Sequence, residues 1–199
     1  MCTKCIVQLP FTNDNSFDES LLLDKFLGRL EIKNAWAFLR FRKAGAVQQL
    51  LHQLKYNNKP EIGVRLGKIA GEQLIRSGFN IELDMIIPVP LHPSRQRNRG
   101  YNQSAKFAEG LSEALKVPVN QKACRRLTNT KTQTKKTREE RWENVEKVFQ
   151  IINPDQLKNK KVLLVDDIIT TGATFEACGH ILLKAECKEL SMACIAHAQ

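Results

Sequence analysis

The stretch KKVLLVDDIITTGATF, residues 160–175, constrains the fold more than any other part of the chain. Residues 162–165 are apolar without alternation, which is typical of a parallel strand covered on both faces. Asp166 and Asp167 follow, and then a loop rich in threonine and glycine. Because ligands bind at the carboxyl ends of parallel strands, this stretch predicts an α/β fold with a ligand site at the strand end.

The rest of the chain supports this fold class. With 199 residues and 42% hydrophobic residues, it is long enough for one sizeable core. Apolar residues recur at helical spacing in several segments, and short apolar runs lie between them. We expect helices at about 47–54, 62–74, 102–115 and 173–184, and strands at 84–90, 117–119, 145–151, 161–167 and 190–198. The pattern predicts a mainly parallel twisted sheet flanked by helices, with a small N-terminal appendage. We place the boundary between residues 1–41 and 42–199, and interpret 91–100 as a loop.

The aspartate pair and the following loop carry a recognisable chemistry. Two adjacent carboxylates can accept hydrogen bonds from vicinal hydroxyls or hold a divalent ion through oxygen. Threonine hydroxyls, free backbone N–H groups and the start of a helix form a site for a phosphate monoester. Together they indicate a phosphorylated sugar such as ribose 5-phosphate. The alternative is a strand end with a solvated aspartate pair and a threonine helix cap. GVRLGKI, residues 63–69, lacks the spacing of a nucleotide-binding P-loop.

The charge of the chain favours a polyanionic partner. Its formal net charge is +10, and residues 122–147 hold nine basic residues against four acids. A second cluster has no acid between its ends; it comprises Arg95, Arg97, Arg99 and Lys106. A phosphorylated small molecule or nucleic acid would suit both clusters, and a solvated basic surface is the alternative. Residues 128–140 have almost no apolar side chain, so we expect a mobile loop or arm there.

The cysteines and the apolar segments limit the location and the metal chemistry. Cys2 and Cys5 have the spacing for one zinc ion, but a closed site needs four ligands, so Zn²⁺ is possible and the site is incomplete. A redox or structural role is equally open. The other cysteines are scattered, which argues against a disulfide framework. No apolar stretch approaches a membrane span, so we expect no membrane insertion and a cytoplasmic protein.

Four stretches of the chain resemble motifs of known protein families, one at the level of a superfamily and three at the level of a branch within it. VLLVDDIITTGAT, residues 162–174, resembles the phosphoribosyl pyrophosphate (PRPP) motif of type I phosphoribosyltransferases. HQLKY at 52–56, PVPLHPSRQRNRGYNQS at 88–104 and QTKKTREERWENVEKVF at 133–149 resemble the ComF/GntX branch of that superfamily. Members of this branch usually open with two Cys-x-x-Cys pairs that form a zinc finger. This chain departs from that pattern, since it keeps only Cys2 and Cys5.

The resemblance implies a role for each matching residue. Asp166 and Asp167 would be the catalytic pair that binds the ribose hydroxyls, with Mg²⁺ accompanying PRPP. The 5-phosphate would be held by Thr170, Thr171, Gly172, Ala173 and Thr174. The pyrophosphate would lie near Leu91, His92 and Arg95, and His92 is equally compatible with a purely structural hydrogen bond. A flexible loop carrying Lys131, Lys135, Lys136 and Arg138 would close over the site.

The resemblance also implies two functions of different classes. The first is an enzyme that binds PRPP and transfers its phosphoribosyl group to a nitrogenous acceptor, releasing pyrophosphate. The acceptor would be recognised by a hood formed from the N-terminal segment. The second is a non-catalytic or accessory protein of DNA uptake and competence, with single-stranded DNA or a helicase as partner. Superfamily members that keep the PRPP site as regulators make the second function a serious alternative.

Overall fold

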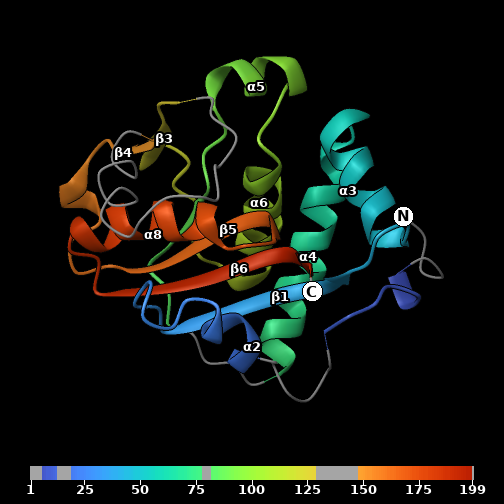
Figure 1. The fold of residues 1–199 in the computed structure, drawn as a ribbon, viewed down its shortest axis with the longest axis horizontal. Coiled ribbons are helices and arrows are strands. Elements are labelled where there is room, and N and C mark those ends of the chain that lie inside the picture. Colours follow the sequence, from blue (N-terminus) through green and yellow to red (C-terminus); the bar gives the residue numbers. More distant parts are fainter. Residues whose placement is uncertain (1–5, 13–18, 78–81, 129–147, 199) are drawn as a thin grey trace.

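A computed structural model describes residues 6–12, 19–77, 82–128 and 148–198. Its centre is a parallel four-stranded sheet with the strand order β1-β6-β5-β2 (Figure 1). The strands are β1 (Asn34–Phe41), β6 (Glu189–Ala198), β5 (Lys161–Ile169) and β2 (Met85–Pro88). The parallel α/β architecture predicted from the sequence is therefore confirmed.

Helices cover both faces of this sheet. On one face, α3 (Ala46–Tyr56), α4 (Pro60–Arg76) and α6 (Gln103–Leu115) pack against inward residues such as Leu163 and Val165. On the other face, α8 (Ala173–Lys184) and the N-terminal segment pack against Val162 and Leu164. Strand β5 is buried on both sides, as its unbroken apolar run predicts.

Helices α4 and α6 approach each other closely through glycine. A Cβ atom added to Gly67 would lie 2.2 Å from the carbonyl oxygen of Phe107, and one added to Gly110 would lie 2.0 Å from that of Val64. Only residues without a side chain permit this approach. The glycines of residues 63–69 therefore serve helix packing in α4, which agrees with the rejection of a P-loop there.

A small second sheet lies beside the main one. It pairs β3 (Cys124–Arg126) with β4 (Phe149–Ile151) in antiparallel register (Figure 1). The short 3₁₀ helix η1 (Pro154–Gln156) then leads into β5. Phe149 is buried in the core that α8 shares with the main sheet. The predicted arm at 128–140 falls, apart from Thr128, outside the described residues.

The structure corrects three element predictions. The expected loop 91–100 contains the helix α5 (Pro93–Arg99). The expected strand 117–119 is reduced to one isolated bridge, between Val119 and Ile86. Strand β1 was not predicted at all, and it lies within the 1–41 segment that was expected to be an appendage. The helix α2 (Glu19–Asp24) precedes it.

The described residues bear on the expectations about disulfides and about membrane spans. Cys124, Cys178, Cys187 and Cys194 are buried free thiols, so these four cysteines form no disulfide framework. In the described part of the chain, no helix combines the length and the apolar character that crossing a membrane requires.

Candidate functional site at the carboxyl edge of the sheet

The loop between β5 and α8 encloses a small pocket. The pocket has a volume of about 220 Å³ and is lined by residues 168–175. Gly172 stands before the first residue of α8 with φ +79°, a left-handed conformation that glycine adopts without strain. The N-cap residue Gly172 has no side chain, and the amide of Ala173 donates to the hydroxyl of Thr171 at 3.4 Å. Thr170 and Thr171 are exposed. The pocket therefore combines hydroxyl groups with a helix N-terminus, which suits a phosphate group.

The N-terminal segment holds this loop from outside. The Lys25 ammonium donates to the carbonyl oxygen of Thr170 at 3.0 Å. Arg29 forms an ion pair with Glu176 in the first turn of α8. The ring of Phe26 lies so close to Gly172 that a Cβ atom there would come within 2.9 Å of it. The loop conformation is therefore fixed by both charge and packing.

Asp166 is held by a hydroxyl and a backbone amide. Its Oδ1 accepts from Ser104 Oγ at 2.7 Å and from the amide of Asp167 at 2.8 Å. Removal from water, and then the negative charge of Asp167, raise the pKa of Asp166 to about 7. The Ser104 hydroxyl opposes this shift because it stabilises the charged form. Asp166 can therefore change its charge near neutral pH.

Asp167 is held by a cation. The ammonium nitrogen of Lys55 lies 2.9 Å from Oδ1 and 2.9 Å from Oδ2 of Asp167. The two side chains retain only 20% and 12% of their exposure, so this ion pair is largely removed from water. Lys55 stands in the last turn of α3, where the helix dipole favours a positive charge.

Hydrogen bonds between helices fix the residues around the pair. Tyr101 donates from its hydroxyl to the carbonyl oxygen of Leu54 at 2.5 Å, which ties the end of α3 to the segment before α6. Asn102 caps α6 by accepting from the amide of Ser104, and its amide group donates to the carbonyl oxygen of Val89. Val89 in turn pairs with Val165 beside the aspartates. Asn102 therefore serves as the N-cap of α6.

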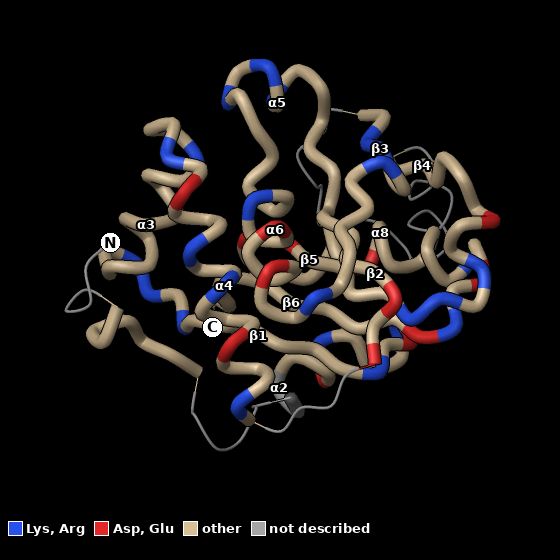
Figure 2. Tube along the Cα trace, turned by 180° about the vertical axis from the view of Figure 1, so that it is seen from behind, with Lys and Arg blue, Asp and Glu red and all other residues tan. Residues whose placement is uncertain are grey.

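The predicted pyrophosphate residues follow β2, the neighbour of β5. His92 caps α5, because its Nδ1 accepts from the amide of Ser94 at 3.2 Å. This hydrogen bond is the structural role that the sequence left open for His92. The arginines of α5 lie at one end of the molecule (Figure 2). Burial and then the charge of Arg95 lower the pKa of Arg126 on β3, while the charge of Asp166 opposes the shift, so Arg126 lies within electrostatic reach of both.

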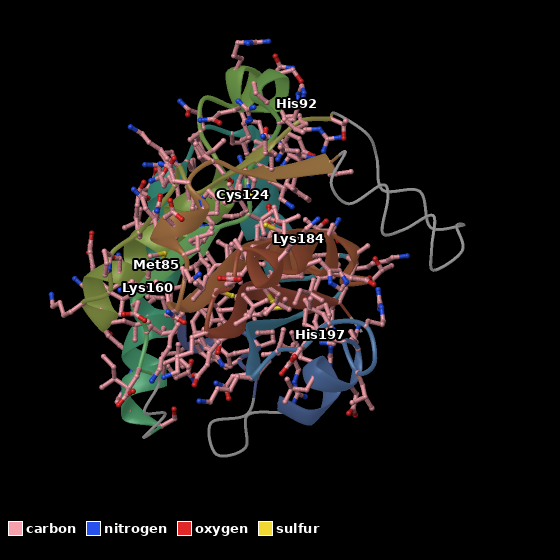
Figure 3. All side chains as sticks on the ribbon, turned by 90° about the vertical axis from the view of Figure 1, so that its left-hand side faces the viewer. Met85, His92, Cys124, Lys160, Lys184 and His197 are labelled. Atoms are coloured by element: carbon pink, nitrogen blue, oxygen red, sulfur yellow. The ribbon has the colours of Figure 1, made fainter. Side chains whose placement is uncertain are left out.

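The structure brings part of the predicted site together. The aspartate pair and residues 170–174 lie at the carboxyl end of β5, and Leu91 and His92 follow the adjacent strand β2. Figure 3 shows Met85 and Lys160, near the amino ends of β2 and β5, on the opposite side from His197 near the carboxyl end of β6. The remaining predicted residues lie outside the described part of the chain: Cys2, Cys5, Lys131, Lys135, Lys136 and Arg138.

Sequence reasoning missed several residues of this edge. Lys55 and Ser104 contact the aspartates directly, and Lys25 contacts Thr170 in the loop between β5 and α8. A signal existed for the first two, because Lys55 lies in HQLKY and Ser104 ends the stretch PVPLHPSRQRNRGYNQS. For Lys25 no motif gave a signal.

The described residues offer no metal site made by the protein alone. Among them, no group of three or more histidine, cysteine, aspartate or glutamate side chains could hold an ion. Asp166 and Asp167 are oxygen donors of the type that Mg²⁺ prefers, but Lys55 already faces both oxygens of Asp167. Among the residues that the structure describes, these side chains therefore do not form a magnesium site on their own.

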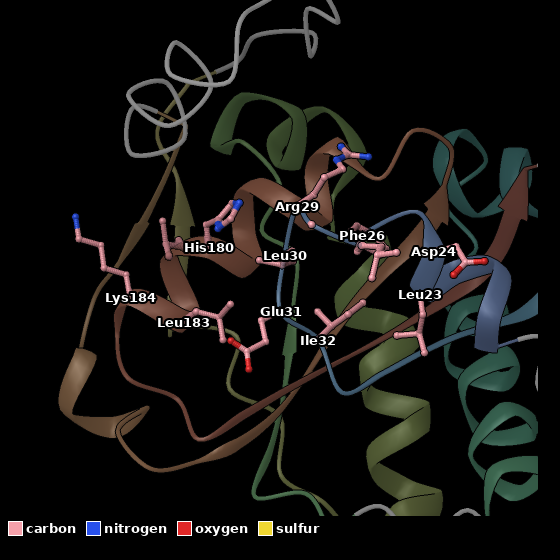
Figure 4. Close-up of a pocket in the computed structure, with 13 residues that line it drawn as sticks. Leu23, Asp24, Phe26, Arg29, Leu30, Glu31, Ile32, His180, Leu183 and Lys184 are labelled. Carbon is pink, nitrogen blue, oxygen red and sulfur yellow. The ribbon is translucent and has the colours of Figure 1, made fainter.

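A second pocket, of about 890 Å³, lies between the N-terminal segment and α8 (Figure 4). Apolar side chains including Leu23, Leu30 and Leu183 surround it, and Lys184 stands at its border. None of the predicted site residues lines it. The aspartates and the loop at residues 170–174 thus lie outside this second pocket.

Comparison with known proteins agrees with this geometry. Residues 103–199 match the family described as the phosphoribosyl transferase domain. Competence protein F of Haemophilus influenzae is 34% identical over 201 residues, which cover 99% of this chain and 78% of that protein. The chain belongs to the ComF family of phosphoribosyltransferase-like proteins. A further relative is the DNA utilization protein YhgH of Shigella flexneri. It is 30% identical over 155 residues, which cover 76% of this ComF chain and 67% of YhgH.

Solved structures show the same fold. The structure of the allosteric regulatory enzyme of purine biosynthesis aligns with a TM-score of 0.50 and 18% identity, covering 72% of this ComF chain and 29% of that chain. The glutamine PRPP amidotransferase of Bacillus subtilis aligns with the same TM-score and identity, over 72% and 30% of the two chains. At 18% identity the likeness shows the fold alone, and the function of the site depends on the residues that this chain places there.

Proposed function

We propose that this ComF protein binds PRPP and transfers its phosphoribosyl group to a nitrogenous acceptor. The observation that carries the proposal is the arrangement at the end of β5. Two carboxylates there directly precede a pocket of about 220 Å³ that opens at the start of α8. A phosphate group in this pocket would place the attached ribose beside Asp166 and Asp167.

The residues at this edge suit the two halves of a ribose phosphate. The hydroxyls of Thr170, Thr171 and Thr174 and the N-terminus of α8 would bind the 5-phosphate. The oxygens of Asp166 and Asp167 would accept hydrogen bonds from the ribose hydroxyls. As charge develops on the ribose ring during transfer, the adjacent carboxylates would stabilise it.

The leaving group would lie toward β2 and α5. Leu91 and His92 begin this segment, and the charges of Arg95 and Arg126 would attract the pyrophosphate. Magnesium is expected to arrive on the pyrophosphate oxygens, since the described side chains alone offer no site for it. Lys131, Lys135, Lys136 and Arg138 are proposed to close over the site, which would exclude water during transfer. The N-terminal segment that precedes β1 is proposed to supply the acceptor hood.

Calorimetric titration with PRPP in the presence of Mg²⁺ tests the proposal. The wild-type protein should bind PRPP, and the double variant Asp166→Asn/Asp167→Asn should lose this binding. Asparagine keeps the size of the side chain but removes the charge, and circular dichroism checks that the variant is folded. Equal PRPP affinity of both proteins would refute the assignment of the carboxylates.

The accessory function in DNA uptake is the second candidate. Two observations favour it: the relatives named Competence protein F and DNA utilization protein, and the arginines gathered on α5. DNA binding through such arginines would weaken steeply as salt rises, because counterions are released from the phosphates. DNA binding that persists in the double aspartate variant, together with no PRPP binding by the wild type, would favour this function.

A further inference from the structure

The aspartate pair already carries a cation of its own. Lys55 reaches both oxygens of Asp167 with equal distances of 2.9 Å. A largely buried carboxylate needs a counter-ion, and an ammonium group in this position meets that need. Lys55 therefore occupies the position at Asp167 that a divalent metal ion would otherwise take.

Hydrogen-bonding capacity remains for a ligand. A carboxylate offers about four lone-pair positions, and Lys55 uses one on each oxygen of Asp167. On Asp166, the hydroxyl of Ser104 and one backbone amide both donate to Oδ1. Hydroxyl groups could thus still donate to both aspartates, while the ammonium group would repel a metal ion.

We propose that Lys55 is a built-in counter-ion, which makes the aspartate pair a receptor for the vicinal hydroxyls of ribose 5-phosphates without a metal ion. The inference rests on the proposed function and deepens it, because it names the ligand class. That class includes PRPP and also nucleotides that lack the pyrophosphate group. Metal dependence would then belong to the pyrophosphate half of the ligand alone.

Binding of ribose 5-phosphate distinguishes the counter-ion role of Lys55 from a purely structural role in which Lys55 only anchors α3. We expect calorimetry on the full chain to show ribose 5-phosphate binding that is unchanged when EDTA replaces Mg²⁺. The variant Lys55→Met should bind it at least about tenfold more weakly in EDTA, because the carboxylate loses its orienting cation. Lys55→Arg, which keeps the charge, should restore most of the affinity. 2-Deoxyribose 5-phosphate should bind more weakly than ribose 5-phosphate, since one hydroxyl is missing.

A matched control removes another lysine from an ion pair. Lys33 pairs with Glu189 at 2.8 Å near the amino ends of β1 and β6, away from the site. Lys33→Met makes the same change of charge and should leave ribose 5-phosphate binding unaltered. If Lys55→Met does not fold, the comparison of EDTA with Mg²⁺ on the wild type still decides the question.

The outcomes separate this inference from the proposed function. PRPP binding in Mg²⁺ combined with ribose 5-phosphate binding that requires Mg²⁺ would overturn the role of Lys55 and leave the proposed function standing. Unchanged affinity in a folded Lys55→Met variant would do the same, and would assign Lys55 to the anchoring of α3. Absence of binding for PRPP and ribose 5-phosphate under both conditions would overturn both proposals.

Discussion

Asp166 and Asp167 are neighbours of the same residue type, yet different helices hold them. Ser104 at the start of α6 bonds Asp166, and Lys55 at the end of α3 pairs with Asp167. One aspartate thus gains a neutral donor and the other a full positive charge. The pair is therefore asymmetric, and its two members should respond differently to substitution.

The asymmetry predicts a pH-dependent cost in stability at Asp166. Burial raises the pKa of Asp166 from 3.8 to about 7 in the folded protein. The folded state therefore keeps its full stability below pH ~4, where the carboxyl is protonated in both states, and loses this contribution as the pH rises through 7. Asp166→Asn cannot ionise, so it should raise the midpoint of thermal unfolding at pH 8 by about 2–4 °C, the shift that one kcal/mol gives in a chain of this size. At pH 4 the gain should vanish, and an equal gain at both pH values would contradict this explanation.

The residues of the site differ in how far the sequence could predict them. The aspartates and the loop 170–174 lie within one segment of nine residues, so their order along the chain already shows their chemistry. Lys55 and Ser104 lie 112 and 62 residues away from the aspartates that they contact. Only the packing of α3 and α6 on the sheet brings them to the strand end. Chemistry carried within one segment was therefore predictable. The quoted motifs contain Lys55 and Ser104, but the sequence did not show that these residues contact the aspartates.

At the scale of helices and strands, the elements with a clear local sequence pattern were predicted and those without one were missed. Helices α3, α4, α6 and α8 were predicted because their apolar residues recur at helical spacing. Helix α5 has no buried residue, so it lacks that signal. Instead, the residues at its two ends define it: the side chain of His92 caps its start, and Gly100 ends it in a left-handed conformation. Strand β1 was missed, although its residues 35–39 are all buried.

The contact between α4 and α6 gives a prediction at this scale. Gly67→Ala should destabilise the protein by about 1–3 kcal/mol, because the added methyl group meets backbone atoms of α6 that cannot rotate away. Alanine favours an isolated helix over glycine by about 1 kcal/mol, so the sign of the change tests the packing directly. Urea denaturation measures it, with the exposed Glu72→Ala in the same helix as the control. A Gly67→Ala variant as stable as wild type would show that the helices can separate without cost.

At the scale of the whole molecule, the parallel sheet explains why the site residues meet. Parallel strands point their carboxyl ends to one edge, so the segments after β2 and β5 and the end of β6 are neighbours there. The chain also carries a net charge of +10, which would attract any phosphate-rich ligand to this edge or to α5. Charge alone therefore does not distinguish a PRPP site from a DNA-binding surface.

The basic segment predicted from the sequence separates these two uses of charge. The variant Lys131→Ala/Lys135→Ala/Lys136→Ala should reduce turnover far more than PRPP affinity, as expected for contacts made mainly in the transition state. Steady-state kinetics compared with calorimetry measures the difference. If the same variant instead reduced the salt dependence of DNA binding and left PRPP chemistry unchanged, the segment would be a nucleic-acid arm.

The most direct test of the account is a crystal structure of the protein with PRPP and Mg²⁺. We predict the 5-phosphate in the pocket lined by residues 168–175, and the ribose hydroxyls on the carboxylates of Asp166 and Asp167. Lys55 should remain beside Asp167, and the pyrophosphate should point toward Arg95. PRPP bound only to the arginines of α5, with the pocket after β5 empty, would contradict the account.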